Sequence, residues 1–381
     1  MVCPYSWSFP GGVQAHVGGL ARAVREQGVE VDILAPVDGP AGGERPIALG
    51  RTVAIRDNGS VTRVALGPAA VARTRRAIAA GGYDLLHLHE PILPATCLTA
   101  LLTAHLPLVG TFHMSAERPG WYGRFAPFCR WALRRLDVRV AVSASARDHV
   151  ARTCPADYRI IPNGIDLAEE RVEGGVRDGS RVVFVGRPDR RKGLPVLLEA
   201  FARLRGRPSL ELVGVTQRQL GQIAPGLSRG VAARVRPHGR VDDAARRRLL
   251  AEADVLVAPS LRGESFGVVL LEGMAAGLPV VASALPGYAQ ILAPGCGRLV
   301  PPGRAEPLAA ALTELLADPE TRRRMGAAGR RAVERFGWDR IAEELVGVYM
   351  EALGGLPARP APALPPEPVA RAAGAASGTR R

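Results

Sequence analysis

Val182-Val183-Phe184-Val185-Gly186-Arg187 runs into Pro188-Asp189-Arg190-Arg191-Lys192-Gly193, an apolar run followed by a basic loop. Four consecutive apolar residues are typical of a buried parallel strand, and the basic, glycine-flanked loop leads into a helix predicted over Pro195–Leu204. Where a strand runs through a loop into a helix, the backbone amides at the helix start attract anions. The stretch therefore predicts an α/β domain with a phosphate site in this loop.

Lys192 is the only lysine among the 50 lysine and arginine residues of the chain. A lysine ammonium is a compact point charge and an arginine guanidinium is a planar fork, so the two residues are not interchangeable. Arg187 and Lys192 together present two cations that suit a diphosphate leaving with negative charge. The alternative is an ordinary solvated basic loop.

The same alternation of short apolar runs and helical segments extends along the chain and predicts parallel sheets. It predicts two Rossmann-like domains facing a deep interdomain cleft, with a polar, glycine-rich linker between Ile165 and Ser180. The predicted division is an N-terminal domain (1–165), a C-terminal domain (166–337), a helix that crosses back to the first domain (338–353) and a disordered tail rich in Pro, Ala and Arg (354–381). The predicted strands are Glu30–Ala35, Asp84–His89, Leu108–Phe112, Val138–Val142, Tyr158–Ile161, Val182–Val185, Leu210–Val213, Val235–Pro237, Val255–Ala258, Pro279–Ala282 and Gly297–Val300.

The composition narrows the class of protein. The chain has 381 residues, 47% of them hydrophobic, and no apolar run reaches the roughly 20 residues of a membrane-spanning helix. Five cysteines without a CxxC pair indicate reduced thiols in a cytosol. A Pro-Gly-Gly turn interrupts the N-terminus too early for a signal peptide. Met1-Val2-Cys3 is too short to cross a sheet, and we expect a few residues to be missing upstream.

The net charge of +14 favours an anionic partner. Nucleic acid, a membrane surface and an anionic substrate all qualify. No recognised nucleic-acid motif or interleaving of aromatic and basic residues supports nucleic acid, and we expect none as a partner.

Two glycine-rich loops precede predicted helices. Pro10-Gly11-Gly12-Val13-Gln14 follows the first strand, where glycine lets a ligand approach the backbone. Gly263-Glu264-Ser265-Phe266-Gly267 leads into a helix that carries Glu272, which places the two carboxylates on the order of 12 Å apart. That spacing suits the two ends of one extended ligand and does not suit an acid/base pair.

Histidines end two of the predicted strands. His87 and His89 alternate along one strand, so both lie on one face, and we expect hydrogen-bonded structural histidines in preference to a metal site because no third ligand is evident. His113 ends the next strand, where the sites of α/β proteins gather. It is the candidate for contact with the reacting centre, and the alternative is a satisfied core histidine.

Together the Gly-Gly loop, His113, Gly-Arg…Lys-Gly and Glu-x7-Glu, in this order, resemble the family 4 retaining glycosyltransferases of the GT-B fold. The resemblance runs from Met1 to about Leu353. Val2-Cys3-Pro4-Tyr5-Ser6, Asn58-Gly59-Ser60-Val61 and His87-Leu88-His89-Glu90-Pro91 are similar to the actinobacterial phosphatidylinositol α-mannosyltransferases of that family.

The resemblance implies GDP-mannose as donor and phosphatidylinositol or another acceptor. It implies His113, Arg187, Lys192 and Glu264 as catalytic residues. It implies donor contacts from Gly12, Arg187, Lys192, Val241, Glu264, Ser265, Phe266, Gly267 and Glu272, and acceptor contacts from Tyr5, Gln14, Asn58, Ser60, Arg63 and Arg118. It implies no required cofactor and no protein metal site, with Mg²⁺ allowed at the donor diphosphate.

A basic helix near Ala70–Ala80 carries Arg73, Arg75 and Arg76 between apolar positions. Clustered arginines on an amphipathic helix suit an anionic membrane surface. In the resembled enzymes the matching helix meets lipid, which implies a cytoplasmic protein, peripheral at the inner face of the membrane. The alternative from the residues alone is a solvated helix face.

The sequence departs from the resembled mannosyltransferases in three places, and these departures bear more on the acceptor than on the donor chemistry. The loop between Arg187 and Lys192 is one residue shorter, Ser8 replaces an acidic residue, and Arg118 replaces a lysine. The alternatives are therefore a family 4 enzyme with a soluble acceptor or another nucleotide sugar, and a nucleotide-sugar-binding protein without catalysis.

Overall fold

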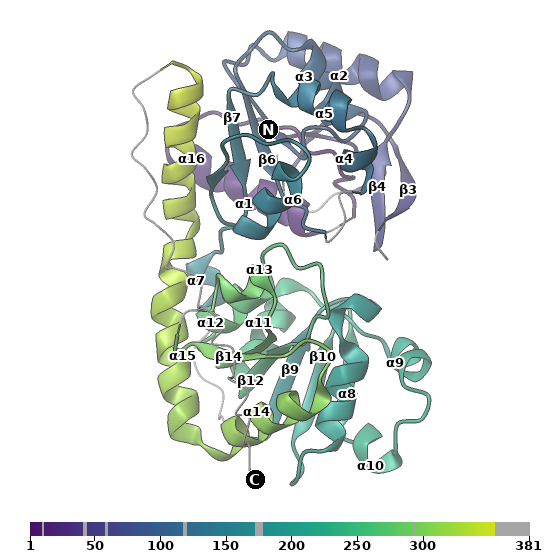
Figure 1. The fold of residues 1–381 in the computed structure, drawn as a ribbon, viewed down its shortest axis with the longest axis vertical. Helices are drawn as coiled ribbons and strands as arrows, with labels where there is room; N and C mark the ends of the chain where they lie inside the picture. Colours follow the sequence, from purple (N-terminus) through teal and green to yellow (C-terminus); the bar gives the residue numbers. More distant parts are fainter. Residues whose placement is uncertain are drawn as a thin grey trace, which may run out of the picture.

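The computed structural model describes residues 1–9, 11–40, 44–57, 60–116, 120–171, 178–292 and 294–354, and only the backbone of 56, 57, 60, 61, 120 and 121. Two mostly parallel sheets, each flanked by helices, form two α/β units that lie one above the other in Figure 1. This arrangement confirms the predicted fold class. Asn58, Arg118 and the tail from residue 355 lie outside the described residues.

The sheet of the first domain is parallel. Its short strands are, in spatial order, β2 (Ile47–Ala48), β1 (Leu34–Ala35), the single residue Val2, β5 (Leu86–His89), β6 (Leu108–Phe112), β7 (Val138–Ala141) and β8 (Arg159–Ile160). Val2 forms parallel bridges to Leu34 on one side and to Leu88 on the other. The predicted strand Glu30–Ala35 is wrong in length, because only its last two residues pair with a neighbour.

Helices cover both faces of this sheet. α1 (Gly12–Glu26) and α16 (Trp338–Ala352) pack together on one face. The other face is covered by α2 (Pro68–Ala80), α3 (Thr96–Thr103) and α5 (Ala126–Leu133), while α4 (Gly120–Arg124) and α6 (Ala144–Ala151) follow β6 and β7. An antiparallel hairpin of β3 (Thr52–Asp57) and β4 (Ser60–Ala65) was not predicted.

The second sheet is parallel throughout, in the order β11 (Val235–Gly239), β10 (Ser209–Val213), β9 (Arg181–Val185), β12 (Val255–Ala258), β13 (Val280–Ser283) and β14 (Gly297–Val300). The strand order reverses between β9 and β12, and in the first domain it reverses between Val2 and β5. Ligands of open parallel sheets bind beyond the carboxyl ends of the strands at such reversals. The topology thus puts a site at the loops that follow these strands.

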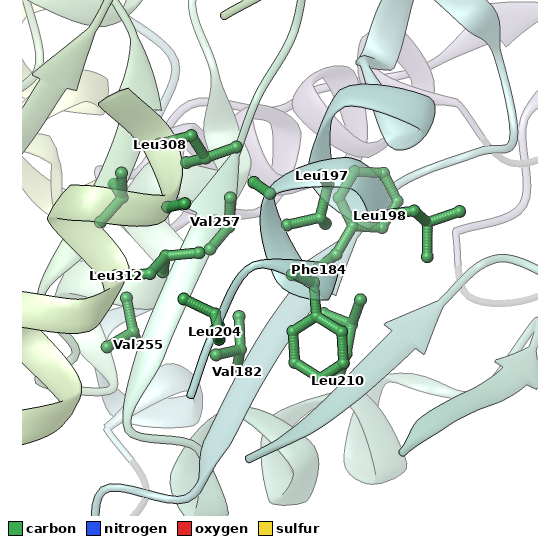
Figure 2. Packing of buried hydrophobic residues seen from close by; sticks show 14 of the residues in the cluster. Val182, Phe184, Leu197, Leu198, Leu204, Leu210, Val255, Val257, Leu308 and Leu312 are labelled. Carbon is green, nitrogen blue, oxygen red and sulfur yellow. The ribbon is translucent and has the colours of Figure 1, made fainter. Parts of the chain in front are cut away.

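Two large hydrophobic clusters stabilise the second sheet, and Figure 2 shows part of one of them. Phe184 of β9 packs among Leu197 and Leu198 of α8 (Leu194–Ala202), and Val255 and Val257 of β12 meet Leu308 and Leu312 of α14 (Ala305–Ala317). Each fully buried leucine or phenylalanine contributes about 1.5–3 kcal/mol relative to exposure. The remaining helices are α9 (Gln217–Ile223), α10 (Arg229–Ala232), α11 (Asp243–Glu252), α12 (Val268–Ala275), α13 (Pro286–Ala289) and α15 (Pro319–Val333).

The chain crosses between the domains twice at one place. Ile165 leaves the first domain and pairs in parallel with Gly337, and the amide of Trp338 donates to the Ile165 carbonyl at 3.2 Å. The predicted linker holds a short helix, α7 (Leu167–Glu170), because the Asp166 carboxylate accepts from the Glu169 amide and caps it. No helix among the described residues meets the length and hydropathy that crossing a bilayer requires.

Candidate active site at the domain interface

Glu264 is the centre of the charged half of the site. Its Oε1 lies 2.8 Å from Lys192 Nζ and 3.3 Å from Arg191 Nη1, and it accepts a hydrogen bond from Ser260 Oγ at 3.0 Å. The Glu264 side chain is only 9% exposed. The structure therefore brings together two of the predicted catalytic residues, and it adds Arg191, which the sequence reasoning missed.

The basic loop is held in place by a side-chain cap and by a glycine. Asp189 caps the 3₁₀ turn Arg190–Lys192 by accepting from the Arg191 amide at 2.9 Å. Gly193 follows with φ +72°, and a Cβ there would lie 1.9 Å from the Pro259 carbonyl oxygen. Only glycine lets the loop after β9 approach the loop after β12 this closely. Arg187 is exposed and forms no ion pair with any residue that the structure describes.

The start of α12 offers backbone amides. Gly267, its N-cap residue, has φ +111°, and no side chain caps the helix. The amides of Ser265, Phe266 and Gly267 precede this uncapped start, where the helix dipole favours an anion. The Phe266 side chain itself is buried against Phe336, with ring centroids 5.8 Å apart. Gly12 likewise begins α1, whose N-cap Gly11 provides no side-chain cap.

Glu272 is not free. It forms an ion pair with Arg246 of α11, whose Nη2 also lies 2.6 Å from Glu170 Oε1. Burial raises the pKa of Glu272, against the opposing pull of the Arg246 charge. A ligand hydroxyl that donates a hydrogen bond to the Glu272 carboxylate must therefore share this carboxylate with Arg246. Neither Arg246 nor Glu170 was predicted, since ion-pair partners from separate helices leave no local pattern.

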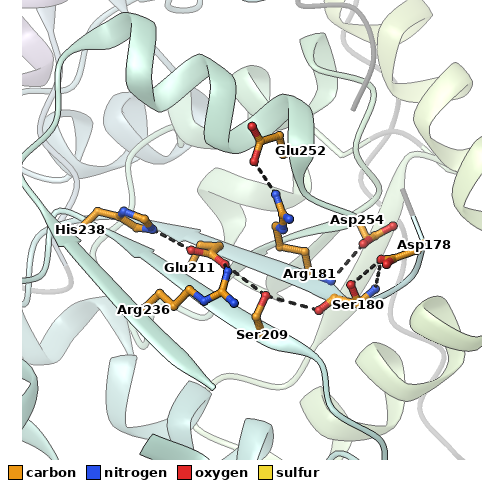
Figure 3. A network of polar contacts seen from close by, with 9 residues as sticks. All are labelled: Asp178, Ser180, Arg181, Ser209, Glu211, Arg236, His238, Glu252 and Asp254. Atoms are coloured by element: carbon orange, nitrogen blue, oxygen red, sulfur yellow. Dashed lines mark hydrogen bonds and ion pairs between the residues drawn. The ribbon is translucent and has the colours of Figure 1, made fainter. Parts of the chain in front are cut away.

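The loop expected to meet the base follows β11. Val241 is half-buried there, just before α11. Figure 3 shows Glu211 of β10 in the centre of a polar network: its Oε2 lies 2.7 Å from His238 Nε2, and Ser209 Oγ donates to its Oε1 at 3.1 Å. Glu211 is buried, so this contact anchors the residue that precedes the Gly239–Val241 turn.

The other half of the site consists of buried histidines. His16 of α1, His89 of β5 and His113 after β6 present ring nitrogens that lie within 4.8 Å of one another. Burial lowers the pKa of His16 to about 4 and those of His87, His89 and His113 well below the ordinary value. All four rings are therefore neutral at pH 7.

His16 corrects the expectation that no third nitrogen ligand accompanies the paired histidines. The three rings offer the kind of donors that a transition metal takes. The absence of a metal site in this protein stays a prediction. By contrast, the expectation of hydrogen-bonded histidines agrees with the geometry: His87 contacts Tyr349 Oη at 2.8 Å and Thr111 Oγ1 at 2.7 Å.

The contact between His89 and His113 decides which nitrogens carry protons. His89 Nδ1 lies 3.0 Å from His113 Nε2, while the buried His89 Nε2 has no partner among the described residues. A buried N–H without an acceptor is costly, so the favoured tautomer places the His89 proton on Nδ1. His113 Nε2 then accepts, and His113 carries its proton on Nδ1. Glu90 fixes the His113 backbone by accepting from its amide at 2.7 Å.

The predicted acceptor residues gather around the loop after Val2. Gln14 Nε2 donates to the carbonyls of Ser6 and Phe9, both at 3.0 Å, and Arg63 lies over the Phe9 ring at 4.3 Å. Tyr5 pairs with Val64 of β4, the strand that contains Ser60. The structure thus brings Tyr5, Gln14 and Arg63 together.

The carboxyl end of the first sheet faces the donor loop. Gln290 Oε1 accepts from the Ala144 amide at 3.3 Å, and Gln290 Nε2 donates to the Ser265 carbonyl at 3.3 Å. Ala144 begins α6, directly after β7, and Ser265 belongs to the loop after β12. One side chain therefore connects the two halves of the site across the domain interface.

The expectation of no required cofactor, with Mg²⁺ allowed at the donor diphosphate, stays a prediction. The histidine cluster is the only group of three metal-ligating side chains among the described residues. At the donor loop the positive charge comes from Arg187, Arg190, Arg191 and Lys192. The three arginines predicted to meet a membrane, Arg73, Arg75 and Arg76, are all exposed on α2.

Comparison with known proteins agrees with this geometry. The family model "Glycosyltransferase Family 4" matches residues 10–169, and "Glycosyl transferases group 1" matches residues 168–332. The chain is 39% identical over 362 residues to a phosphatidyl-myo-inositol mannosyltransferase of Mycolicibacterium smegmatis. The aligned region covers 93% of this chain and 94% of that protein. The chain is 34% identical to the enzyme of the same name from Propionibacterium freudenreichii, covering 92% and 94% of the two chains.

Solved structures show the same fold. The chain matches Anabaena HepE in complex with UDP with a TM-score of 0.71 at 20% identity, over 90% of this chain and 97% of that one. It matches a sucrose-phosphate synthase from Thermosynechococcus elongatus with a TM-score of 0.73 at 25% identity, over 92% and 96% of the two chains. With the family shown in sequence and the fold in structure, the chain belongs to the family 4 glycosyltransferases of the GT-B fold and is a hexosyltransferase.

Proposed function

We propose that the protein transfers mannose from GDP-mannose to phosphatidylinositol, with retention, at the cytoplasmic face of the membrane. The observation that carries the proposal is the buried Glu264 carboxylate, held by Lys192 and Arg191 beside the uncapped start of α12. The names of the relatives, phosphatidyl-myo-inositol mannosyltransferases, support mannose as the sugar and phosphatidylinositol as the acceptor.

The donor diphosphate lies against the cations. Arg187 and Lys192 neutralise its charge, and the amides of Ser265–Gly267 and the start of α1 at Gly12 add backbone donors. A Cβ on Gly12 would meet no protein atom within 4 Å, which leaves room for a ligand there. The proposal requires no cofactor and allows Mg²⁺ to accompany the donor diphosphate.

The sugar lies between the two halves of the site. Glu264 accepts hydrogen bonds from its hydroxyls, and the His113 Nδ1–H donates near the anomeric carbon. Glu272 accepts from the ribose while it keeps its pairing with Arg246, and the backbone at Val241 meets the base.

The chemistry consists mainly of charge stabilisation. The bond from the anomeric carbon to the diphosphate breaks, and the acceptor hydroxyl forms a new bond on the same face. The departing diphosphate takes the hydroxyl proton and leaves as GDP. Lys192 and Arg187 stabilise the charge that develops on it, which is the largest single contribution in such transfers. Binding both substrates side by side supplies the rest.

The first domain binds the acceptor and faces the membrane. Tyr5, Gln14 and Arg63, together with Asn58, Ser60 and Arg118, contact the inositol phosphate. The exposed Arg73, Arg75 and Arg76 of α2 meet anionic lipid, so the enzyme is peripheral to the membrane.

The test is a product assay. Purified protein is incubated with GDP-mannose and vesicles that contain phosphatidylinositol, and the lipids are analysed by mass spectrometry. We expect one hexose on phosphatidylinositol, formed about 10²–10³-fold more slowly by the Lys192→Ala variant. The Arg205→Gln variant, which changes an exposed arginine far from the site, is the matched control.

Two outcomes contradict the proposal in different ways. Protection against thermal unfolding by GDP-mannose without a lipid product would keep the donor and overturn the acceptor. A product with another nucleotide sugar, and none with GDP-mannose, would overturn the donor.

A further inference from the structure

A groove lined by three arginines lies on the first domain, outside the residues assigned to the active site. It has a volume of about 110 Å³ and lies between the end of α5 and the loop before β8. Its lining is Arg130, Leu133, Arg134, Arg139, Cys154, Pro155, Ala156 and Tyr158. One water occupies roughly 30 Å³ in the liquid, so a phosphate-sized group fits.

The arginines of this groove retain free charge. Arg130 Nη1 donates to the Thr153 carbonyl at 3.4 Å, and Arg139 Nη2 donates to the Leu133 carbonyl at 2.7 Å. Neutral carbonyls do not cancel a guanidinium charge, and none of the three arginines forms an ion pair with any residue in the described part of the chain. Asp157, the one acidic residue of the loop 152–158, is exposed and does not pair with them either. The groove is therefore a concentrated positive site, and guanidinium groups suit phosphate oxygens.

Aromatic side chains flank the groove on the same helix. Phe128 is 37% exposed and Trp131 is 57% exposed, with ring centroids 5.8 Å apart. Helical spacing puts Trp131 and Arg134 on adjacent parts of the outer face of α5, opposite the buried Cys129 and Ala132. Trp and Phe beside arginines are typical of segments that lie at a lipid headgroup boundary.

The groove shares a face of the molecule with α2. Helices α2, α3 and α5 pack on one core cluster on the same face of the first sheet, and α3 contacts both α2 and α5. In Figure 1, α2 and α3 lie at the end of the first domain far from the second, and α5 lies next to α3. The basic α2 and the aromatic α5 therefore belong to one helical layer on the same face of the first sheet.

We propose that this α5 groove, formed by Arg130, Arg134 and Arg139, binds the phosphate of an anionic phospholipid while Phe128 and Trp131 enter the headgroup layer. The site is separate from the acceptor residues, and it holds the enzyme on the membrane instead of presenting the lipid for reaction. It rests on the proposed function only in placing the protein at a membrane.

The main experiment is vesicle flotation with the full chain at fixed ionic strength. The vesicles contain phosphatidylcholine with or without phosphatidylinositol. For the Arg130→Gln/Arg134→Gln variant we expect the partition onto anionic vesicles to fall by about tenfold to thirtyfold. The control variant Arg205→Gln/Arg207→Gln removes two exposed arginines from the second domain and is expected to bind like the parent protein. Equal binding of the two double variants would overturn the proposal.

Trp131 fluorescence provides a second measurement, which is made on the parent protein and does not depend on the folding of the arginine variants. Bromine-labelled lipids are expected to quench part of the tryptophan fluorescence of the parent protein, and the Trp131→Phe variant is expected to lose that part. No difference between the two would overturn the insertion of α5.

Two further arms separate the neighbouring explanations. Thermal protection by inorganic phosphate that the Arg130→Gln/Arg134→Gln variant loses, without any loss of vesicle binding, would assign the groove to a soluble anion and overturn the lipid. Vesicle binding lost in Arg73→Gln/Arg75→Gln/Arg76→Gln but kept in the α5 variant would also overturn it. Thermal protection by GDP-mannose and the lipid product are measured for every variant. Vesicle binding through α5 in a protein that adds no mannose to phosphatidylinositol would refute the proposed function and leave this site standing.

Discussion

The two halves of the site differ in how they hold a ligand. In the second domain Lys192, Arg191 and Glu264 form a charged cluster on two loops at the reversal of the strand order. In the first domain His16, His89 and His113 form a buried cluster that is neutral at pH 7. One half therefore suits an anion by charge, and the other suits a neutral polar ligand by directed hydrogen bonds.

The largest effect is expected where the charge is removed. Lys192→Ala leaves Glu264 with Arg191 as its cationic partner but takes away stabilisation of the leaving group, and Glu264→Ala removes the carboxylate that holds both Lys192 and Arg191. We expect turnover to fall by about 10²–10³-fold. Steady-state kinetics with GDP-mannose measures it, with circular dichroism as the folding control. Turnover within threefold of the parent protein would remove both residues from the mechanism.

The second test concerns Arg246, which connects Glu272 to Glu170. Arg246→Ala leaves two carboxylates together without their cation, so we expect a loss of about 1–3 kcal/mol in the free energy of unfolding. Arg246→Lys is the matched variant and is expected to recover part of it. Urea unfolding measures both, and an unchanged midpoint in Arg246→Ala would show that the pair has no structural role.

A third test uses pH to sharpen the contrast. The folded-state pKa of His16 is about 4 because the ring is buried, below the ordinary 6.5 of an unfolded chain. Between these values the unfolded state binds more protons, so the stability that neutral His16 provides above pH 6.5 is lost as pH falls. The loss is about 2 kcal/mol at pH 5. Thermal unfolding of the parent protein and of His16→Asn should show a smaller pH slope in the variant; equal slopes would place His16 outside the titrating set.

The smallest effect is expected at the bridge between the halves. Gln290→Ala removes hydrogen bonds to the Ala144 amide and the Ser265 carbonyl. Water replaces both partners at the interface, so we expect a change of less than about 1 kcal/mol in stability and of a few fold in acceptor KM. Gln290→Glu keeps the acceptor oxygen and tests which contact matters. A loss of turnover as large as that of Lys192→Ala would make this bridge part of the catalytic machinery.

The sequence predicted the two halves unequally, for a physical reason. The strands of the second sheet were located to within one or two residues, and the charged loops are continuous stretches in which local spacing carries the information. In the first domain β1 is only two residues long and the β3–β4 hairpin was missed, because pairing to distant strands decides them.

The partners of the predicted residues were also missed. His16 faces inward from α1, and in the sequence it looks like any other residue on the buried side of an amphipathic helix. Only the packing of α1 on the sheet brings it to His89 and His113. Arg191 is one of three consecutive basic residues, and its choice of Glu264 follows from the turn that Asp189 caps. Such pairings depend on tertiary structure and leave no spacing that a single sequence reveals.

The measurement that most directly tests the division between the halves is calorimetric titration of GDP-mannose into two variants, Lys192→Ala and His113→Asn. The charged half is expected to supply donor binding and His113 to act mainly in the transfer. Lys192→Ala should therefore lose donor affinity by more than about tenfold, while His113→Asn keeps it within a few fold and loses turnover. The reverse pattern, with affinity lost at His113 and kept at Lys192, would contradict the account.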